Sequence, residues 1–184
     1  MSLKFAILAV LSHRDRTGYE LTRKMDGSVA NFWPATHQQI YQELKKLDAS
    51  GLVHFKEKKQ LEKPDKKIYS ITRGGHAALK GWISEPLEPT PSKDALLIKL
   101  FAGHLVSGEV LLDELSKHEK THRSKLVEYR QIERDHFLKR ALPPELLSQY
   151  LGLRKGILYE EGWLRWCRES MEKIRQSRRG PASH

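Results

Sequence analysis

The chain has 184 residues, of which 39% are hydrophobic, and its mean hydropathy of −0.61 predicts a soluble protein. No stretch approaches the roughly 18 uninterrupted apolar residues that would span a membrane, which excludes a membrane-spanning protein. The formal net charge of +10 favours polyanionic partners, of which nucleic acid is the commonest in the cytoplasm. Cys167 is the single cysteine, which excludes an internal disulfide framework and suits a reducing, cytoplasmic location.

Two helices are expected at the start of the chain. Leu3 to Leu11 is a compact apolar run, which predicts a helix that is buried on most of its surface. Thr17 is expected to cap a second helix, with Glu20 three residues later completing a capping box. This second helix is expected to end near Gly27.

The third expected helix has two distinct faces. Thr36 is expected to cap it and Ser50-Gly51 to end it, while Ile40, Leu44 and Leu47 recur at helical spacing. An apolar back holds a helix on its domain, and polar groups near its N-terminus can then reach base edges in the major groove. The opposite face is polar, so this segment is a candidate recognition helix. An amphipathic surface helix with merely solvated glutamines has the same pattern.

A β-hairpin and a fourth helix complete the first half. Residues 52–56 and 67–71 alternate apolar and polar side chains, as two antiparallel strands with one face on a core do. A polar, lysine-rich turn joins them. Thr72 is expected to start a helix that contains Leu79 and Trp82. Three helices, a basic hairpin and a returning helix, in this order, predict a winged helix-turn-helix domain.

The hairpin favours DNA binding over a merely solvated surface. A basic loop beside a recognition helix suits the minor groove or the flanking phosphates. Glutamine side chains can pair with adenine edges, and hydroxyl groups can contact phosphate or sugar. The residues expected at the DNA are Tyr19, Thr36, His37, Gln38, Gln39, Tyr41, Gln42, Lys45, Lys58, Lys59, Lys66 and Lys67.

Three prolines, Pro86, Pro89 and Pro91, divide the chain. Each removes a backbone donor and disfavours helix at the residue before it, so residues 86–92 are expected to form an inter-domain linker. Residues 1–85 then form the winged helix-turn-helix domain, residues 93–175 a helical, coiled-coil-like dimerisation domain, and residues 176–184 a basic tail that we expect to be disordered. The predicted fold class is mostly α with a small β-hairpin.

The second half carries apolar residues at three- and four-residue spacing. This spacing predicts helix-on-helix packing, either within the chain or across a two-fold axis. After Pro143-Pro144 only Glu160 interrupts the repeat. The residues expected at a dimer interface are Leu111, Leu115, Tyr150, Leu153, Ile157, Leu164, Cys167 and Met171.

Several anchors resemble the PadR family of bacterial transcriptional regulators. They are Gly18-Tyr19-Glu20-Leu21, Gln39-Ile40-Tyr41 with Leu44 and Leu47, Gly51-Leu52-Val53, and Tyr69-Ser70-Ile71-Thr72 with Gly75 and Trp82. The run from Phe32-Trp33 to Gln38-Gln39 is closer to the virulence-activator branch, and residues 92–175 are similar to the helical C-terminal domain of that branch. The resemblance implies a homodimer that binds a pseudo-palindromic operator in double-stranded DNA, with a small aromatic effector left open. An RNA-binding or architectural protein is the alternative within nucleic-acid binding.

A rival interpretation comes from residues 118–122, which read His-Glu-Lys-Thr-His and satisfy the H-E-x-x-H pattern of zinc proteases. His118 and His122 could share a zinc, with Glu119 as the base. A third protein ligand is also needed, and neither Glu133 nor Glu145 is singled out for it. Both histidines fall on the packing seam, so we expect seam histidines, no metal, no cofactor and no enzyme. A zinc-dependent hydrolase is the alternative outside nucleic-acid binding.

Two further features of the second half have both a structural and a functional interpretation. Cys167 is expected to be a small core residue, although Arg165 and Arg168 could lower its pKa and make it a redox sensor. An aromatic cluster is expected to lie mostly in the core, with room for an aromatic effector as its other interpretation: Tyr150, Tyr159, Trp163 and Trp166.

Overall fold

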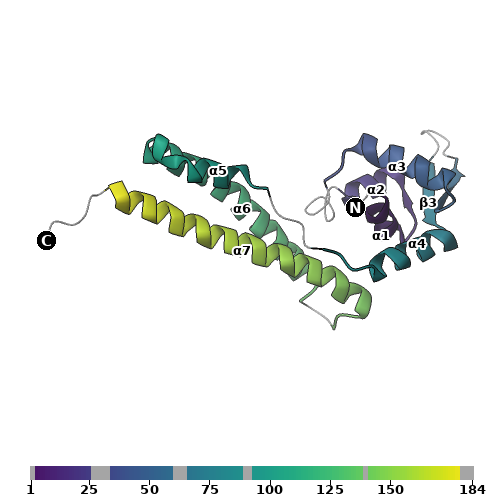
Figure 1. Ribbon diagram of the computed structural model, residues 1–184. Helices are drawn as coiled ribbons and strands as arrows, with labels where there is room; N and C mark the ends of the chain where they lie inside the picture. The colour runs from purple at the N-terminus through teal and green to yellow at the C-terminus, as the bar shows by residue number, and fades with distance from the viewer. Residues whose placement is uncertain (1–2, 26–33, 60–65, 89–92, 139–140, 179–184) are drawn as a thin grey trace. The chain divides into compact units, whose positions relative to one another are not determined.

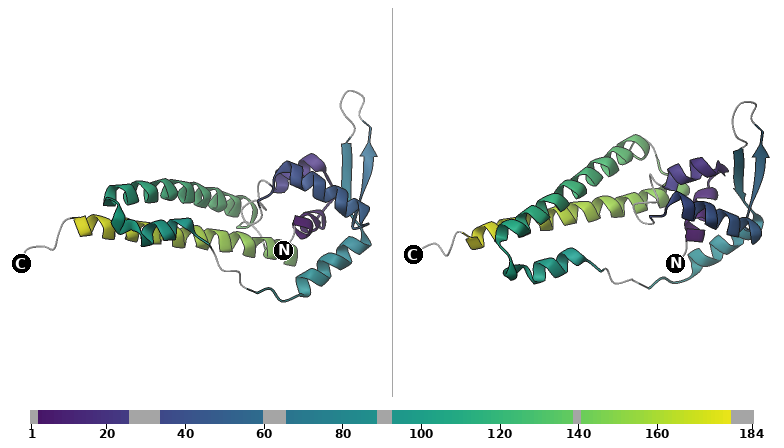
Figure 2. Two further views of the ribbon diagram at one scale, coloured as in Figure 1. Left: turned by 45° about the horizontal axis from the view of Figure 1, so that its top comes forward. Right: turned by 90° about the horizontal axis from the view of Figure 1, so that it is seen from above.

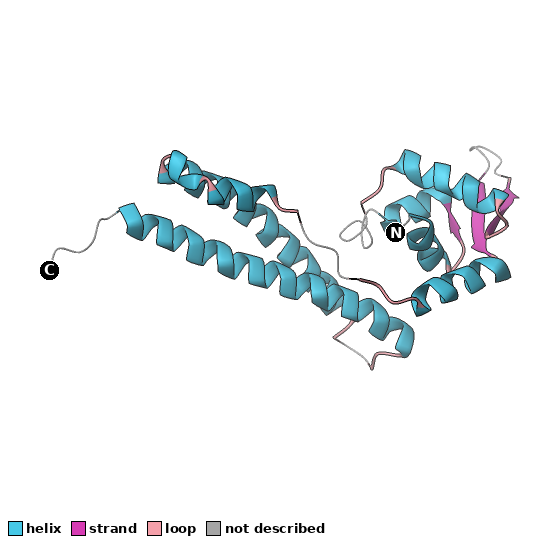
Figure 3. Ribbon diagram, in the orientation of Figure 1, coloured by secondary structure: helices cyan, strands magenta, loops and turns pink. Residues whose placement is uncertain are grey.

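The computed structural model describes residues 3–25, 34–59, 66–88, 93–138 and 141–178. The chain divides into two compact units, residues 1–90 and 91–184 (Figure 1). In the described ranges the first unit combines helices with a small sheet, and the second contains helices (Figure 3). None of the described helices is long and apolar enough to cross a membrane.

The first unit has the element order predicted for a winged helix-turn-helix domain. It contains α1 (Leu3–Leu11), β1 (Arg16–Thr17), α2 (Gly18–Lys24), α3 (His37–Ala49), β2 (Val53–Lys58), β3 (Lys66–Ile71) and α4 (Arg73–Ser84). The four helices and the hairpin are confirmed. The predicted end of α2 near Gly27 lies outside the described residues. β1 was not predicted, because two residues are too few to show an alternating pattern.

Threonine residues start three of these helices. Thr17, Thr36 and Thr72 have extended backbones, and each side chain accepts a hydrogen bond from the backbone N–H three residues later. Glu20 and Gln39 also reach back to the N–H of their capping threonine, which makes two capping boxes. The predicted caps and the Thr17–Glu20 box are confirmed, and the box at Gln39 is an additional finding.

The end of α3 leads directly into the sheet. Gly51 has a φ of 68°, in the left-handed region that favours glycine, and the Leu52 N–H donates to the Leu47 carbonyl at 2.9 Å. This confirms the predicted stop at Ser50-Gly51. The described strands form an antiparallel sheet in the order β1-β3-β2, with Phe55 opposite Tyr69.

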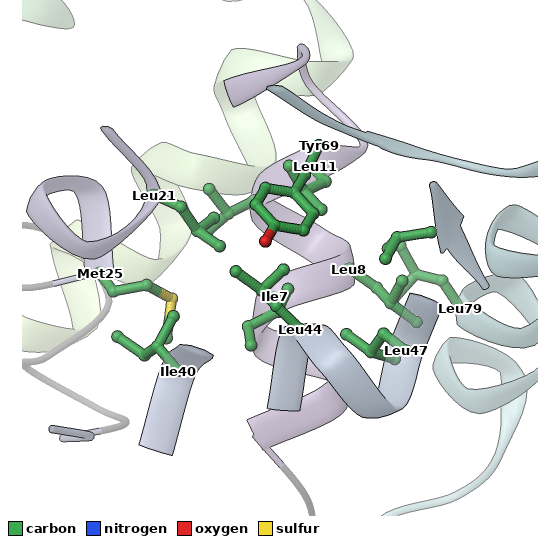
Figure 4. Close-up of a cluster of buried hydrophobic side chains, with 12 residues drawn as sticks. Ile7, Leu8, Leu11, Leu21, Met25, Ile40, Leu44, Leu47, Tyr69 and Leu79 are labelled. Carbon is green, nitrogen blue, oxygen red and sulfur yellow. The ribbon is translucent and has the colours of Figure 1, made fainter. Parts of the chain in front are cut away.

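The core of the first unit is built from every helix and both long strands. Ile7, Leu8 and Leu11 of α1 have exposed fractions of 1% or less, which confirms the predicted buried first helix. Figure 4 shows the side chains that surround them: Leu21, Met25, Ile40, Leu44, Leu47, Tyr69 and Leu79. Burying one such aliphatic side chain contributes about 1.5–3 kcal/mol, so this cluster fixes α3 against the rest of the unit.

The second unit contains α5 (Ala95–Phe101), the short 3₁₀ helix η2 (Gly103–Leu105), α6 (Gly108–His136) and α7 (Pro144–Arg178). The two long helices lie side by side in all views (Figure 1, Figure 2). Their core includes Leu96, Leu115, Cys167 and Met171. The predicted fold class is confirmed. The tail expected from residue 176 is still helical through Arg178, and the rest of it, like residues 89–92 of the expected linker, lies outside the described residues.

Candidate nucleic-acid interface

The third helix presents an apolar face to the core and a polar face to the surface. Ile40, Leu44 and Leu47 are at most 1% exposed. The opposite face carries four of the residues predicted to contact DNA, all of them exposed: His37, Gln38, Gln42 and Lys45. Because the buried face holds α3 rigidly, these polar side chains are presented from a fixed backbone, as base-edge recognition requires.

Thr36 and Gln39 are bonded to each other at the start of α3. The Gln39 N–H donates to Thr36 Oγ1 at 3.2 Å, and the Thr36 N–H donates to Gln39 Oε1 at 2.9 Å. These bonds satisfy backbone donors that the first turn of a helix leaves open. Both residues therefore position the recognition helix, and a DNA contact by either one stays a prediction.

Tyr41 packs on the start of α2. A Cβ built at Gly18 would lie 2.5 Å from Cε1 of the Tyr41 ring and 2.9 Å from its hydroxyl oxygen, so only glycine permits this approach. Tyr41 is nevertheless 42% exposed, and Tyr19, next to Gly18, is 64% exposed. The structure thus gives Tyr41 a packing role between α2 and α3 and leaves part of its ring at the surface. Phe32 and Trp33 lie outside the described residues.

The wing brings lysines close together. Lys58 of β2 and Lys66 of β3 lie directly opposite each other in the strand register, and both are exposed. Like charges in directly opposite positions destabilise a strand pair, and a phosphate group placed between them would offset that repulsion. Lys59 follows at the end of β2 and is also exposed. Residues 60–65 of the predicted turn lie outside the described residues.

Lys67 differs from the other wing lysines because it has partners within the hairpin. Its Nζ lies 4.0 Å from the centroid of the Phe55 ring and 3.8 Å from Glu57 Oε1. Both partners are at the surface or half-buried, where such contacts contribute at most about 1 kcal/mol. These contacts orient the lysine without removing it from the surface of the wing.

Arg16 is a candidate site residue that the sequence pattern does not mark. It lies on β1, opposite Tyr69 of β3. Its Nε is buried and has no hydrogen-bond partner within the described part of the chain. Sequence patterns could not single out Arg16, because its position depends on the pairing of the two-residue strand β1 with β3, which is distant in sequence.

The residues predicted at a dimer interface lie in the packing of a single chain. Five of them are at most 5% exposed: Leu115, Ile157, Leu164, Cys167 and Met171. The other three, Leu111, Tyr150 and Leu153, are half-buried. Of the two arrangements that the spacing left open, packing within the chain accounts for these side chains. A contact of any of these eight residues with a second copy stays a prediction.

The two histidines of the H-E-x-x-H pattern belong to the packing between α6 and α7. His122 Nδ1 lies 2.5 Å from Glu160 Oε2, and its ring stacks on Trp163 with centroids 3.8 Å apart. Glu160 is 3% exposed, so the residue that interrupts the apolar repeat of α7 is the partner of His122. His118 stacks more loosely on Trp163, at 5.9 Å, and lies 3.8 Å from Glu114.

The acidic residues of the zinc interpretation have structural partners of their own. Glu119 pairs with Arg123, one turn along α6. Glu133 accepts hydrogen bonds from Tyr150 at 2.9 Å and from Arg154 at 3.1 Å. The side chain of Glu145 lies outside the described set. Among the described side chains, no group of three or more His, Cys, Asp or Glu could hold a metal ion.

Cys167 lies in the core of the second unit. It is 0% exposed, and its Sγ donates to the Leu115 carbonyl at 3.6 Å. Burial, and next the charge of Glu119, raise the pKa of the Cys167 thiol, against a smaller opposite effect of Arg168. The prediction of a core cysteine is confirmed. The suggestion that Arg165 and Arg168 bring the thiol pKa below its ordinary value is wrong, because desolvation of the thiolate outweighs the opposite effect of Arg168.

The aromatic cluster is less buried than predicted. Trp163 and Trp166 pack edge to face with centroids 5.3 Å apart, and both are half-buried. Tyr159, expected in the core, is 59% exposed. Tyr159 lies between the buried positions Ile157 and Glu160, and the centroid of its exposed ring is 6.2 Å from that of His122 on α6.

Two protein families match the chain, one in each unit. Residues 7–81 match the family described as transcriptional regulator PadR-like, and residues 92–175 match the virulence activator alpha C-terminal family. The chain is also 36% identical over 189 residues to Rv1176c of Mycobacterium tuberculosis, described as a probable transcriptional regulator, with 97% of this chain and 100% of that protein covered.

Solved structures are similar over nearly the whole chain. Bacillus subtilis PadR in complex with operator DNA has a TM-score of 0.82 and 28% identity, with 94% of this chain and 98% of that chain covered. The Vibrio cholerae virulence activator AphA has a TM-score of 0.77 and 33% identity, with 96% and 99% covered. Bacillus subtilis PadR has also been crystallised in complex with p-coumaric acid.

Proposed function

Because the chain belongs to the PadR-like family, which consists of DNA-binding transcriptional regulators and not of enzymes, we propose that it acts as a homodimer on a pseudo-palindromic operator. Each winged-helix domain, residues 1–85, contacts one half-site, with α3 in the major groove and the wing on the flanking phosphates. Residues 93–175 hold the two copies together, and residues 86–92 link the two domains.

The observation that carries this proposal is the exposed polar face of a rigidly held α3. Gln38 and Gln42 are four residues apart, so they lie one above the other on the same side of the helix. A glutamine can form two hydrogen bonds with an adenine edge, and a good pair of this kind discriminates against the wrong base by about 1–3 kcal/mol. His37 and Lys45 extend the same surface.

The surface proposed for dimerisation is an apolar group on α5, η2 and the start of α6. Its members are all exposed, with Phe101 at 90%: Leu97, Ile98, Phe101, Leu105, Val106 and Val110. Single exposed apolar residues are normal, but a contiguous cluster marks an interaction site. A second copy is the occupant we propose, because a two-fold axis pairs one surface with itself and suits a two-fold operator.

Exposed leucines of α7 support the same proposal. Leu147, Leu151 and Leu158 follow one another at spacings of four and seven residues, which places them along one side of the helix. Other side chains, which are already buried, hold α6 against α7. The three exposed leucines are therefore not needed for the packing between these two helices. They offer a second apolar strip to the partner copy.

A small aromatic acid is the effector class that we propose for this regulator. The support comes from Bacillus subtilis PadR, which was crystallised with p-coumaric acid. Titrating p-coumaric acid into the protein–operator complex tests the proposal, with release of the operator as the expected result. An operator affinity that stays constant up to millimolar acid would contradict this effector class and would leave operator recognition untouched.

Operator recognition is tested by selecting bound sites from a random-sequence DNA pool. The selected site should bind at least about 10³-fold more tightly than scrambled DNA. Gln42→Ala should lower affinity for the selected site by about 1–3 kcal/mol and leave scrambled DNA unaffected. Gln149→Ala, which removes an exposed glutamine of α7, is the matched control. Equal affinity for selected DNA, scrambled DNA and RNA across a salt series would instead indicate an architectural or RNA-binding protein.

Dimerisation is tested with charge substitutions at exposed apolar residues. Burying a phenylalanine contributes about 1.5–3 kcal/mol, and two-fold symmetry counts it twice, so Phe101→Asp should raise the dimer Kd by two orders of magnitude or more. Val127→Asp, at a 62% exposed position of α6, is the control. Sedimentation that shows a wild-type monomer at micromolar concentration, or a Phe101→Asp variant as dimeric as the control, would contradict the proposed surface.

A further inference from the structure

A hollow opens on the second unit beside the apolar group proposed for dimerisation. It has a volume of about 300 Å³ and lies between α5, η2, the start of α6 and the end of α7. Its apolar side chains are Leu100, Val106, Leu111 and Ile174, and its polar ones are His104 and Ser177. An apolar cavity of about 150 Å³ accepts benzene, so the hollow has room for one phenyl ring.

A phenyl ring is exposed next to this hollow. Phe101 directly follows Leu100 in the chain and is 90% exposed, so it does not fill the hollow of its own copy. The helix that carries the ring is anchored at two points. Leu96 is buried in the core of the second unit, and Lys99 Nζ lies 2.5 Å from Glu114 Oε1 of α6. Because α5 is already held in place, little ordering of the backbone is needed when the ring meets a partner.

The segment that carries the ring and most of the hollow is poor in charge. Lys99 and Glu109 are the only Asp, Glu, Lys or Arg residues between positions 95 and 112, whereas these four types make up 30% of the whole chain. The charge of Lys99 is offset by Glu114. Depletion of charged residues around an aromatic side chain is typical of the core of a protein–protein interface. This surface therefore suits a protein partner better than it suits DNA.

The ring and the hollow together form a self-complementary surface. A two-fold axis places the same surface of each copy against the other, so a protruding group and a recess on one surface can fill each other reciprocally. Val106 belongs both to the exposed apolar group and to the lining of the hollow. An interface that covers the apolar group therefore also covers the edge of the hollow, which makes a second copy the partner that this surface fits.

We propose that Phe101 of each copy inserts into the hollow of the other copy, so that two identical ring-in-hollow contacts hold the dimer together. The inference rests on the proposed function, since it specifies the contact through which the proposed homodimer forms. Each ring leaves water and packs on the apolar lining of the hollow, which is the source of the stabilisation. A buried aromatic side chain in a pocket commonly carries a large share of the binding energy of an interface.

The experiment is a double-mutant cycle on the full-length chain, with the dimer Kd measured by sedimentation equilibrium. Phe101→Ala should raise the dimer Kd by at least about a hundredfold, because two rings lose their burial. Ser177→Trp adds a bulky side chain at an exposed position that lines the hollow, and it should raise the Kd to a similar extent. The doubly substituted chain should be no weaker than the weaker single variant, because ring and hollow serve one contact. Additive effects would overturn the proposal.

Disulfide cross-linking tests the contact directly. Chains with Phe101→Cys, mixed with chains with Ser177→Cys and oxidised mildly above the dimer Kd, should give a covalent heterodimer that mass spectrometry identifies. Cys167 is buried and should not compete. Val127→Cys, at a 62% exposed position of α6, replaces Ser177→Cys in the control mixture and should give little heterodimer. Equal yields in the two mixtures would contradict the proposed contact.

Two further outcomes separate this inference from its alternatives. A wild-type monomer at micromolar concentration would overturn the proposed homodimer itself, whereas a dimeric wild type with additive effects in the cycle would overturn the ring-in-hollow contact alone. The hollow could also hold a small acid. Saturable binding of p-coumaric acid that is lost in Ser177→Trp, together with an unchanged dimer Kd of that variant, would overturn the proposal, because the hollow would then hold the acid and not the ring of the partner copy.

Discussion

Removal of His122 should destabilise the second unit strongly, because it leaves the Glu160 carboxylate buried without its partner. Glu160 is 3% exposed, and His122 Nδ1 lies 2.5 Å from its Oε2. Deleting the partner of a buried charge costs about 3–5 kcal/mol, because that charge is left uncompensated. The His122 ring also stacks on Trp163 at 3.8 Å, and losing an aromatic stack adds about 0.5–1.5 kcal/mol. We expect His122→Ala to lower the free energy of unfolding by about 3.5–6.5 kcal/mol.

Urea unfolding of the full-length protein at one fixed concentration measures this cost, since the stability of a dimer depends on protein concentration. His118→Ala is the matched control on the same helix. Its side chain is 41% exposed and lies 3.8 Å from Glu114, so its removal should cost less than about 1 kcal/mol. The doubly substituted His122→Leu, Glu160→Leu chain should recover most of the lost stability, because no charge is left buried.

Equal costs for His118→Ala and His122→Ala would refute this reasoning, as would additive effects of the two leucine substitutions. A stoichiometric zinc that survives dialysis and disappears in the double histidine variant would restore the metal interpretation.

Three further predictions concern the framework of the fold. Gly75→Ala should lower the free energy of unfolding by at least about 1–3 kcal/mol, since the added Cβ would lie 2.1 Å from the Leu52 carbonyl oxygen. Gly81→Ala on the same helix, where a Cβ would meet nothing within 4 Å, should instead raise it by about 0.4–1 kcal/mol, and thermal unfolding tests both. Cys167 should react with a thiol reagent only on unfolding, and rapid labelling of the native protein would contradict its burial. Hydrogen bonds to Thr17 within the first capping box lower the pKa of Glu20 below its ordinary value of 4.5. The stability that the Glu20 carboxylate adds is therefore complete above pH 4.5 and is lost as the pH falls through the lower pKa of the folded protein. The urea midpoints of wild type and Glu20→Gln should accordingly converge in acid.

Locally encoded features were predictable from the sequence. A threonine followed three residues later by Glu20 or Gln39, and the glycine after α3, act through bonds within one turn of chain. Their geometry is set by neighbouring residues alone, so a sequence pattern contains all the information needed. The same holds for the alternation of β2 and β3, whose inward residues meet the core in the observed register.

Features that depend on distant partners were not predictable. β1 exists because Arg16 and Thr17 pair with β3, more than fifty residues away in sequence. The contact of Tyr41 with Gly18 depends on the angle between α2 and α3, which no local pattern specifies. The apolar residues of α7 gain the same hydrophobic free energy whether they pack on α6 of their own chain or on a partner chain. The hydrophobic effect is non-directional, and either arrangement removes the same side chains from water.

The histidine motif of α6 illustrates which information resolves such an ambiguity. Two histidines four residues apart face one way whether they hold a zinc or pack on another helix, so their spacing cannot separate the two roles. The decisive residue is Glu160, which breaks an apolar repeat on the helix that packs against them. A buried carboxylate is costly unless it is paired, so a polar interruption in one seam requires a polar interruption in the seam that faces it. His122 supplies that partner at 2.5 Å, so the packing of α6 on α7 accounts for this histidine.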